Sequence, residues 1–123
     1  MGVRHLLMVG EDIKLTDVQR EKLETMMTDF QMESIDLKAK IEKAQLMFQT
    51  LKQREDAVEA DVMRSIDDAA RLEAEMQKLR YRHHQQARSV LTDEQVKQLQ
   101  QLRQERFQER RESRDKPSWG SGR

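Results

Sequence analysis

Cysteine is absent from this 123-residue chain, and glycine and proline are missing from its interior. Without a thiol the chain can form no disulfide and no thiolate nucleophile or metal ligand, which leaves the redox compartment open. Glycine occurs only at positions 2, 10, 120 and 122, and Pro117 is the single proline. Residues 11–116 therefore contain neither helix breaker, and they are rich in Gln, Glu, Lys, Arg, Leu and Met, which favour helices.

Aromatic residues and long apolar runs are scarce as well. The aromatic side chains are three Phe, one Tyr and one Trp, and no run approaches the roughly 18 apolar residues that span a bilayer. Charged residues make up 37% of the chain and balance to a net charge of zero, so overall charge indicates no partner. Such a composition suits long helices that each bury one narrow apolar stripe. Because a single chain would then bury little apolar surface, we expect an oligomer, which would bury more.

The chain is expected to form one helical domain over residues 1–115, followed by a disordered tail over residues 116–123. Met1, Gly2 and Val3 lack the basic and apolar regions of a secretory signal peptide. If the protein is exported, we expect this chain to begin after the cleavage site.

Apolar residues recur at alternating spacings of four and three, which is a heptad pattern. The first heptad stripe contains Leu23, Met27, Phe30, Ser34, Leu37, Ile41, Ala44, Phe48 and Leu51. The second contains Val58, Val62, Ser65, Ala69, Leu72, Met76, Leu79, His83, Gln86 and Val90. The two stripes are in phase, so the pattern permits either one continuous helix of more than seventy residues or two helices that fold back on each other.

The polar segment at residues 52–56 favours the hairpin. A continuous helix would place the charge of Glu55 in the heptad stripe, whereas Asp56 is suited to cap the start of a new helix. The predicted fold is all-α, a bent helical hairpin of two long helices flanked by a short N-terminal helix and a C-terminal helix. The expected helices lie near residues 3–11, 17–52, 56–90 and 93–113.

Two segments share the pattern Leu-Thr-Asp-x-Gln: Leu15, Thr16 and Gln19 in the first, and Leu91, Thr92 and Gln95 in the second. Threonine is a good N-cap, and a glutamine three residues later can reach back to the backbone amide of the cap, which makes a capping box. Aspartate in the first turn complements the helix dipole. Each motif alone indicates that a helix begins there.

The paired motifs, in an all-helical chain, resemble the LTxxQ-motif periplasmic family, which includes Spy- and CpxP-like chaperones and ZraP- and CnrX-like metal-resistance proteins. The resemblance covers residues 3 to about 112. It implies a hairpin with hooked ends, an antiparallel homodimer that forms a curved cradle, and a periplasmic location. The implied activity is that of an ATP-independent chaperone or an envelope-stress accessory protein, whose partners are unfolded client proteins or a sensor kinase. The alternative is a heavy-metal sensor or resistance protein.

A surface for clients or partners is expected from the methionines and from one basic stretch. The candidate methionines are Met26, Met32, Met47 and Met63, and the candidate basic residues are Lys78, Arg80, Arg82 and Arg88. Methionine is flexible and polarizable, so it suits either a gap-filling core or an apolar surface that moulds to varied chains. The cations would attract acidic, partly unfolded chains over a distance, and the binding would be weak and salt-sensitive.

The histidines raise the possibility of a transition-metal cofactor, with His5 and His83 as candidate ligands of zinc, copper or nickel and Met8 as a soft ligand. His83 stands eight residues before Leu91, as a ligand histidine does in the CnrX-like branch. That branch has methionine and carboxylate ligands where this chain has Ala87 and Met27, so a complete nickel or cobalt site is not expected. The alternative is that His83 packs at an interface and His5 is exposed.

No enzymatic centre is predicted, because the sequence has no nucleophile–base–acid set, no phosphate-binding glycine loop and no H-E-x-x-H motif. Arginines at 103, 106, 110, 111 and 114 alternate with glutamates at 105, 109 and 112. This interleaving and the lack of stacking aromatics argue against nucleic acid binding and favour surface ion pairs along a solvated helix.

Overall fold

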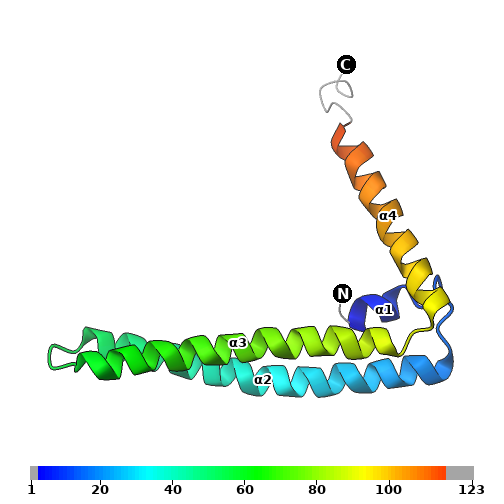
Figure 1. Ribbon diagram of the computed structural model, residues 1–123. Coiled ribbons are helices and arrows are strands. Elements are labelled where there is room, and N and C mark those ends of the chain that lie inside the picture. The colour runs from blue at the N-terminus through cyan, green and yellow to red at the C-terminus, as the bar shows by residue number, and fades with distance from the viewer. Residues whose placement is uncertain (1–2, 116–123) are drawn as a thin grey trace.

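The computed structural model describes residues 3–115, which form four α-helices and no strand (Figure 1). They are α1 (Val3–Met8), α2 (Asp17–Gln53), α3 (Glu59–Ser89) and α4 (Asp93–Asp115). The all-helical class and the order short, long, long and C-terminal helix are confirmed. The proposed disordered tail, residues 116–123, lies outside the described residues. Within the described part of the chain, no helix is both long and apolar enough to cross a membrane.

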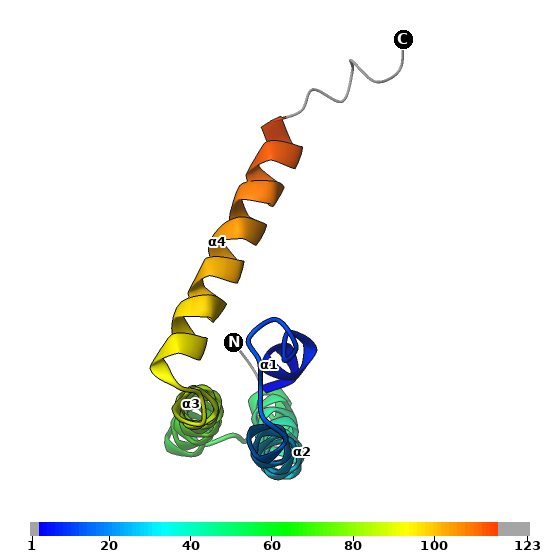
Figure 2. The same cartoon turned by 90° about the vertical axis from the view of Figure 1, so that its right-hand side faces the viewer.

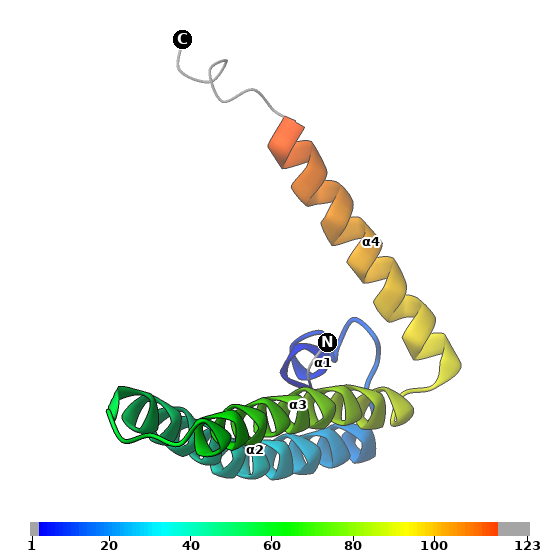
Figure 3. The same ribbon diagram turned by 60° about the vertical axis from the view of Figure 1, so that its left-hand side comes forward.

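α2 and α3 run antiparallel and side by side along their full lengths, so the chain folds back once (Figures 1 and 3). The continuous-helix alternative is wrong. The first heptad stripe faces α3, since all its members are buried or half-buried, whereas the residues between them are exposed except for Met26. Along the arms only Ser34, Met76 and His83 are buried, so the hairpin is thin and most of its side chains face solvent.

The turn between the long helices differs from the prediction. Asp56 does not cap α3; its carboxylate lies 3.7 Å from the Arg54 guanidinium on the exposed loop. α3 begins only at Glu59, because the carbonyl of Val58 is the first to accept helical bonds, from the amides of Asp61 (3.0 Å) and Val62 (3.2 Å). Val58 is the N-cap and has no side-chain capping bond, so this helix start lacks the stabilisation that Ser, Thr or Asp would give.

The second heptad stripe departs from the prediction at both ends. Val58 is mostly exposed, and Gln86 is exposed while the neighbouring Ala87 is fully buried. The next buried residue of the stripe after His83 is therefore four positions along, at Ala87, instead of the predicted three. The reason is that α1 packs against both long helices at this end, which turns the buried face of α3 toward the small Ala87.

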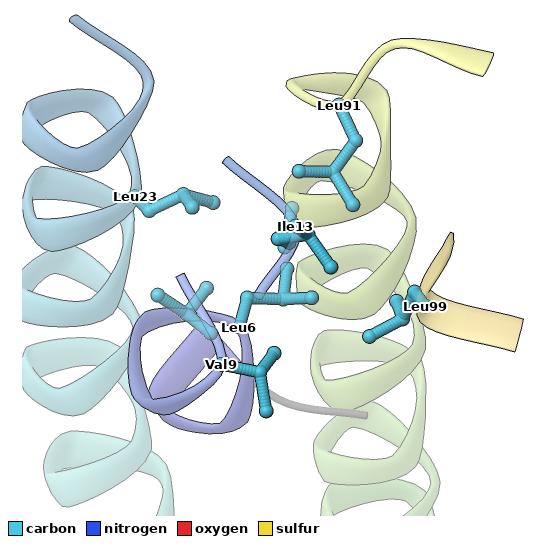
Figure 4. Packing of buried hydrophobic residues seen from close by; sticks show 8 residues of the cluster. Leu6, Val9, Ile13, Leu23, Leu91 and Leu99 are labelled. Carbon is cyan, nitrogen blue, oxygen red and sulfur yellow. The ribbon is translucent and has the colours of Figure 1, made fainter. Parts of the chain in front are cut away.

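The main apolar core lies at the base of the hairpin, opposite the turn, and it is shared by all four helices (Figure 4). Its buried members are Val3, Leu6, Val9, Ile13, Leu23, Ala87, Leu91 and Leu99. α1 ends at Met8, earlier than expected, and the chain then turns through residues 9–14 so that Val9 and Ile13 also enter the core. This small cluster fixes the base and leaves the arms uncovered.

α4 leaves the base at a steep angle and points away from the hairpin (Figures 1 and 2). Its first turns pack on the core through Gln95, Leu99 and Leu102, whereas residues 103–114 are exposed. The predicted surface ion pairs along this helix are wrong. Among the described side chains, those of residues 3–114, the three ion pairs shorter than 4 Å lie in or near the hairpin turn and on α3.

Candidate functional site

The first Leu-Thr-x-x-Gln motif begins α2 with a complete capping box. The backbone amide of Gln19 donates to Thr16 Oγ1 over 3.1 Å, and the backbone amide of Thr16 donates to Gln19 Oε1 over 3.0 Å. Asp17 stands in the first turn, where its negative charge complements the helix dipole. The predicted capping role of Thr16 and Gln19 is confirmed.

The second motif begins α4 in the same way. The backbone amide of Gln95 donates to Thr92 Oγ1 over 3.2 Å, and that of Thr92 donates to Gln95 Oε1 over 2.9 Å. Gln95 is buried, although it is a long polar residue. A buried amide needs partners for both its donors and its acceptor, so the cap alone does not account for its burial.

The missing partner is the glutamine of the other motif. Gln19 Nε2 donates to Gln95 Oε1 over 2.8 Å, and Gln95 Nε2 donates to Gln19 Oε1 over 2.9 Å. The second donor of Gln19 reaches the carbonyl of Val90 (3.0 Å), and that of Gln95 reaches the carbonyl of Lys14 (3.1 Å). Each amide thus donates two hydrogen bonds and accepts two. We call this pair and the two carbonyls the glutamine clasp.

Lys14 adopts an unusual backbone conformation to take part. Its φ of 56° lies in the left-handed region, where a non-glycine residue costs about 1–2 kcal/mol. The carbonyl of Lys14 accepts the hydrogen bond from Gln95, so the strained residue is itself part of the clasp. It is offset by the bond to a buried amide that would otherwise be unsatisfied.

The leucines of the motifs join the clasp to the core. Leu91 is buried in the base cluster, and Leu15 packs partly buried against it. In many helices an apolar residue before the N-cap packs on an apolar residue of the first turn, but here the position that would pack on Leu15 is Arg20. The Arg20 side chain lies over Gly10. A Cβ added to Gly10 would meet Arg20 Nη2 at 2.7 Å and Leu15 Cδ1 at 3.1 Å. The absent side chain at Gly10 lets both residues cover the turn that precedes α2.

The candidate surface methionines are not equivalent. Met32, Met47 and Met63 are 64%, 61% and 55% exposed on the arms. Met26 is half-buried and packs against the base cluster, so it offers little to a partner. The basic candidates Lys78, Arg80, Arg82 and Arg88 are all exposed along the second half of α3.

Sequence reasoning missed an apolar stripe on the side of α2 that faces away from α3. Met32, Ile35 and Leu46 are each about two-thirds exposed, and at 100° per residue they fall within about 60° of one another on the helix. Met63 and Ile66 form a similar, shorter stripe on α3. The spacings of these residues along α2, three and eleven, do not make a continuous four-and-three repeat, so the heptad pattern did not single them out.

The candidate metal ligands do not form a site. No group of three or more His, Asp or Glu side chains suited to a metal ion occurs within residues 3–115. His5 lines a groove beside α4, where partial burial and the charges of Arg106 and Arg103 lower its pKa. Those arginines would also repel a metal cation. The residues present therefore do not fit a zinc, copper or nickel ion.

His83 is instead an interior packing residue. It is buried, and its ring stacks on Phe30 with the ring centres 4.1 Å apart and the planes 13° from parallel. Burial, followed by the nearby charge of His84, lowers the pKa of His83 from its usual value. The neutral ring is thus the form that suits the hairpin.

Comparison with known families agrees with the paired motifs. The family model described as LTXXQ motif family protein matches residues 4–103. This span contains α1 except for Val3, all of α2 and α3, both motifs and the first turns of α4. No curated protein and no solved structure matched the chain significantly.

Proposed function

Because the chain belongs to the LTXXQ motif family, which supports a general periplasmic role related to stress or metals, we propose that it is a periplasmic, ATP-independent chaperone. It holds unfolded or partly folded chains on the open arms of its hairpin. The observation that carries the proposal is the exposed apolar stripe of Met32, Ile35 and Leu46 on a helix that needs only its opposite face to hold the fold. Large apolar side chains that are exposed together on one face of a helix, as Met32 and Ile35 are one turn apart, indicate an interaction site.

The chemistry of the arms suits varied clients rather than one ligand. Met32, Met47 and Met63 are flexible and polarizable, so each adapts to side chains of different shape. The exposed cations of α3, Arg80 and Arg82 among them, attract acidic chains over a distance, after which apolar contacts hold them. The base core lies away from these surfaces, so a client can bind without disturbing the fold.

The same surfaces would suit a folded partner such as a sensor kinase of an envelope-stress response. A sensor domain would be bound at one defined place, whereas clients would be bound along the arms. The two partners differ in a measurable way, since binding to the sensor would saturate at a fixed ratio and client binding would depend on the client's unfolded state.

The metal-binding alternative has less support. A sensor or resistance protein needs several ligands at one place, and His5 and His83 line different grooves. The stack on Phe30 also gives His83 a structural role that accounts for its burial.

The test is suppression of aggregation of a chemically unfolded client, followed by light scattering without ATP. We expect suppression near equimolar ratio, and weaker suppression at high salt. A variant with Met32→Ser, Ile35→Ser and Leu46→Ser should need at least threefold more protein for the same effect. Val18→Ser is the matched control, because Val18 is equally exposed on α2 but lies near the base. Failure of the unchanged protein to suppress aggregation would refute the proposal.

A further inference from the structure

The methionines of the described chain include an exposed group and a protected group. Three of them lie on the arms of the hairpin and are more than half exposed: Met32, Met47 and Met63. Met76 is buried on α3. Met26 and Met27 are half-buried against the base cluster. An oxidant in solution therefore reaches the thioethers of the arms before it reaches those of the interior.

The thioether is also the most readily oxidised group that this chain offers. A cysteine thiolate would react with a peroxide first, but the sequence has no cysteine. Oxidation of a methionine gives the sulfoxide, so a flexible apolar side chain becomes a polar one. Reductases specific for methionine sulfoxide reverse the change, which allows it to act as a switch.

The exposed methionines of the arms stand among other exposed apolar side chains. Met32 lies one turn from Ile35 in the exposed apolar stripe of α2, and Met63 lies one turn from Ile66 on α3. Met47 lies farther along the α2 arm. A sulfoxide at any of these positions places a strong hydrogen-bond acceptor within the apolar surface. An apolar client side chain would then have to remove water from that acceptor, which costs free energy.

We propose that Met32, Met47 and Met63 form a reversible modification site at which a peroxide switches off the binding of unfolded chains. The inference rests on the proposed chaperone function and adds its regulation. The thioether sulfur attacks hydrogen peroxide: an S–O bond forms, the O–O bond breaks, the sulfur gives up two electrons, and the second peroxide oxygen leaves as water. In the reverse reaction a reductase removes the sulfoxide oxygen as water, while a dithiol is oxidised to a disulfide.

The fold should survive this change. None of the three arm methionines belongs to the base cluster, and none occupies a position in either heptad stripe. Met8 provides an internal comparison, because it is 78% exposed but lies at the end of α1, at the base. It should therefore be oxidised as readily as the arm methionines without affecting what the arms bind.

Peptide mass spectrometry of the full chain after limited treatment with hydrogen peroxide tests the order of oxidation. We expect Met8 and the three arm methionines to be oxidised at least about tenfold faster than Met76. The helical signal in circular dichroism should stay unchanged while Met76 is still reduced. Equal rates at Met76 and the arm methionines, or loss of the helical signal before Met76 reacts, would overturn the proposal.

Aggregation suppression by the same samples, after the peroxide is removed, tests the switch. The oxidised chain should be needed in at least about threefold greater amount than the untreated chain, and a sulfoxide reductase with a dithiol should restore the original activity. A variant with Met32→Leu, Met47→Leu and Met63→Leu keeps apolar side chains of similar size, so it should suppress aggregation and be insensitive to peroxide. Met8→Leu is the matched control and should remain sensitive.

The outcomes separate the switch from the function. Suppression by the untreated chain that persists after the arm methionines are oxidised would overturn the inference alone. Protection by Met8→Leu equal to that of the triple variant would do the same. If the untreated chain suppresses no aggregation, the proposed function is refuted and the inference with it.

Discussion

Gln19 and Gln95 are 76 residues apart in the chain, yet their side-chain amides exchange two hydrogen bonds of 2.8 and 2.9 Å. Each amide also caps the start of its own helix, so one pair of side chains sets the beginning of α2 and α4 and holds the two starts together. The clasp lies beside the base core, where the first turns of α4 meet the hairpin. This arrangement stabilises one end of a thin molecule and leaves the arms of the hairpin uncovered.

Glutamine should be irreplaceable by glutamate at both positions. In an ordinary capping box glutamate serves as well as glutamine, but Gln19→Glu or Gln95→Glu removes two donors and brings a charge against an oxygen acceptor. We expect each substitution to lower the free energy of unfolding by about 2–3 kcal/mol in urea titrations followed by circular dichroism. Gln100→Glu, exposed on α4, should change it by less than about 0.5 kcal/mol. Tolerance of glutamate at either position would reduce the motif to two independent caps.

The two glutamines should also be energetically coupled. In a double-mutant cycle with Gln19→Ala and Gln95→Ala, the second substitution should cost less than the first, with an interaction energy of about 1 kcal/mol or more. Strictly additive effects would show that the amide pair contributes nothing beyond the separate capping boxes.

A capping residue at the start of α3 should raise the stability of the protein. Val58 is the N-cap, is mostly exposed and makes no capping bond, so Val58→Ser should raise the free energy of unfolding by about 0.5–1.5 kcal/mol. Asp56→Ala should have little effect, since Asp56 makes one exposed ion pair and does not cap the helix. Urea titrations of the two variants check both statements, and a large loss in Asp56→Ala would restore the capping role predicted from the sequence.

Acidification should weaken the hairpin through His83. Its folded pKa is lowered mainly by burial, so the unfolded chain binds more protons than the folded chain below the usual value of 6.5. Stability is therefore complete above pH 6.5 and declines as the pH falls through 6.5 toward the lowered value. His83→Phe, which keeps a ring against Phe30, should show a smaller fall in melting temperature between pH 7.5 and 5.5. His5 and His84 shift in the same direction, so part of the dependence should remain. An unchanged dependence would contradict the role given to His83.

Zinc, copper and nickel should each produce no saturable heat at micromolar concentration in calorimetry. The reason is that His5 lies among arginines and His83 is stacked in the interior, so the two do not share a site. His83→Ala is the control variant. Saturable heat that disappears in this variant would revive the metal-binding alternative.

The helices and the hairpin could be predicted because their causes are local or periodic. The absence of breakers between residues 11 and 116, the capping boxes and the four-and-three spacing are visible in the sequence itself. The errors at Asp56 and Gln86 arose where packing and turn geometry overrode these signals. Asp56 lies in the turn, two residues before the N-cap Val58. Ala87, and not Gln86, faces the core, because α1 packs against α3 there.

The glutamine clasp could not have been predicted in the same way. Each motif is fully explained as a cap, and nothing in its spacing indicates that the amides meet. Their contact depends on the left-handed turn at Lys14 and on the place where α4 leaves the base, which are properties of the tertiary structure. The exposed stripe on α2 likewise became visible only once the buried face of that helix was known.

The central claim is that the open arms, rather than the base, bind unfolded chains. Site-specific photocross-linking tests it most directly, with the photoreactive residue placed in turn at Met32, Leu46 and Met63, and at Val18 as the control near the base. The account predicts that the three arm positions cross-link an unfolded client at least severalfold more than Val18 does, and that the folded client is not captured. Equal labelling at Val18 and the arm positions, or capture of the folded client, would contradict it.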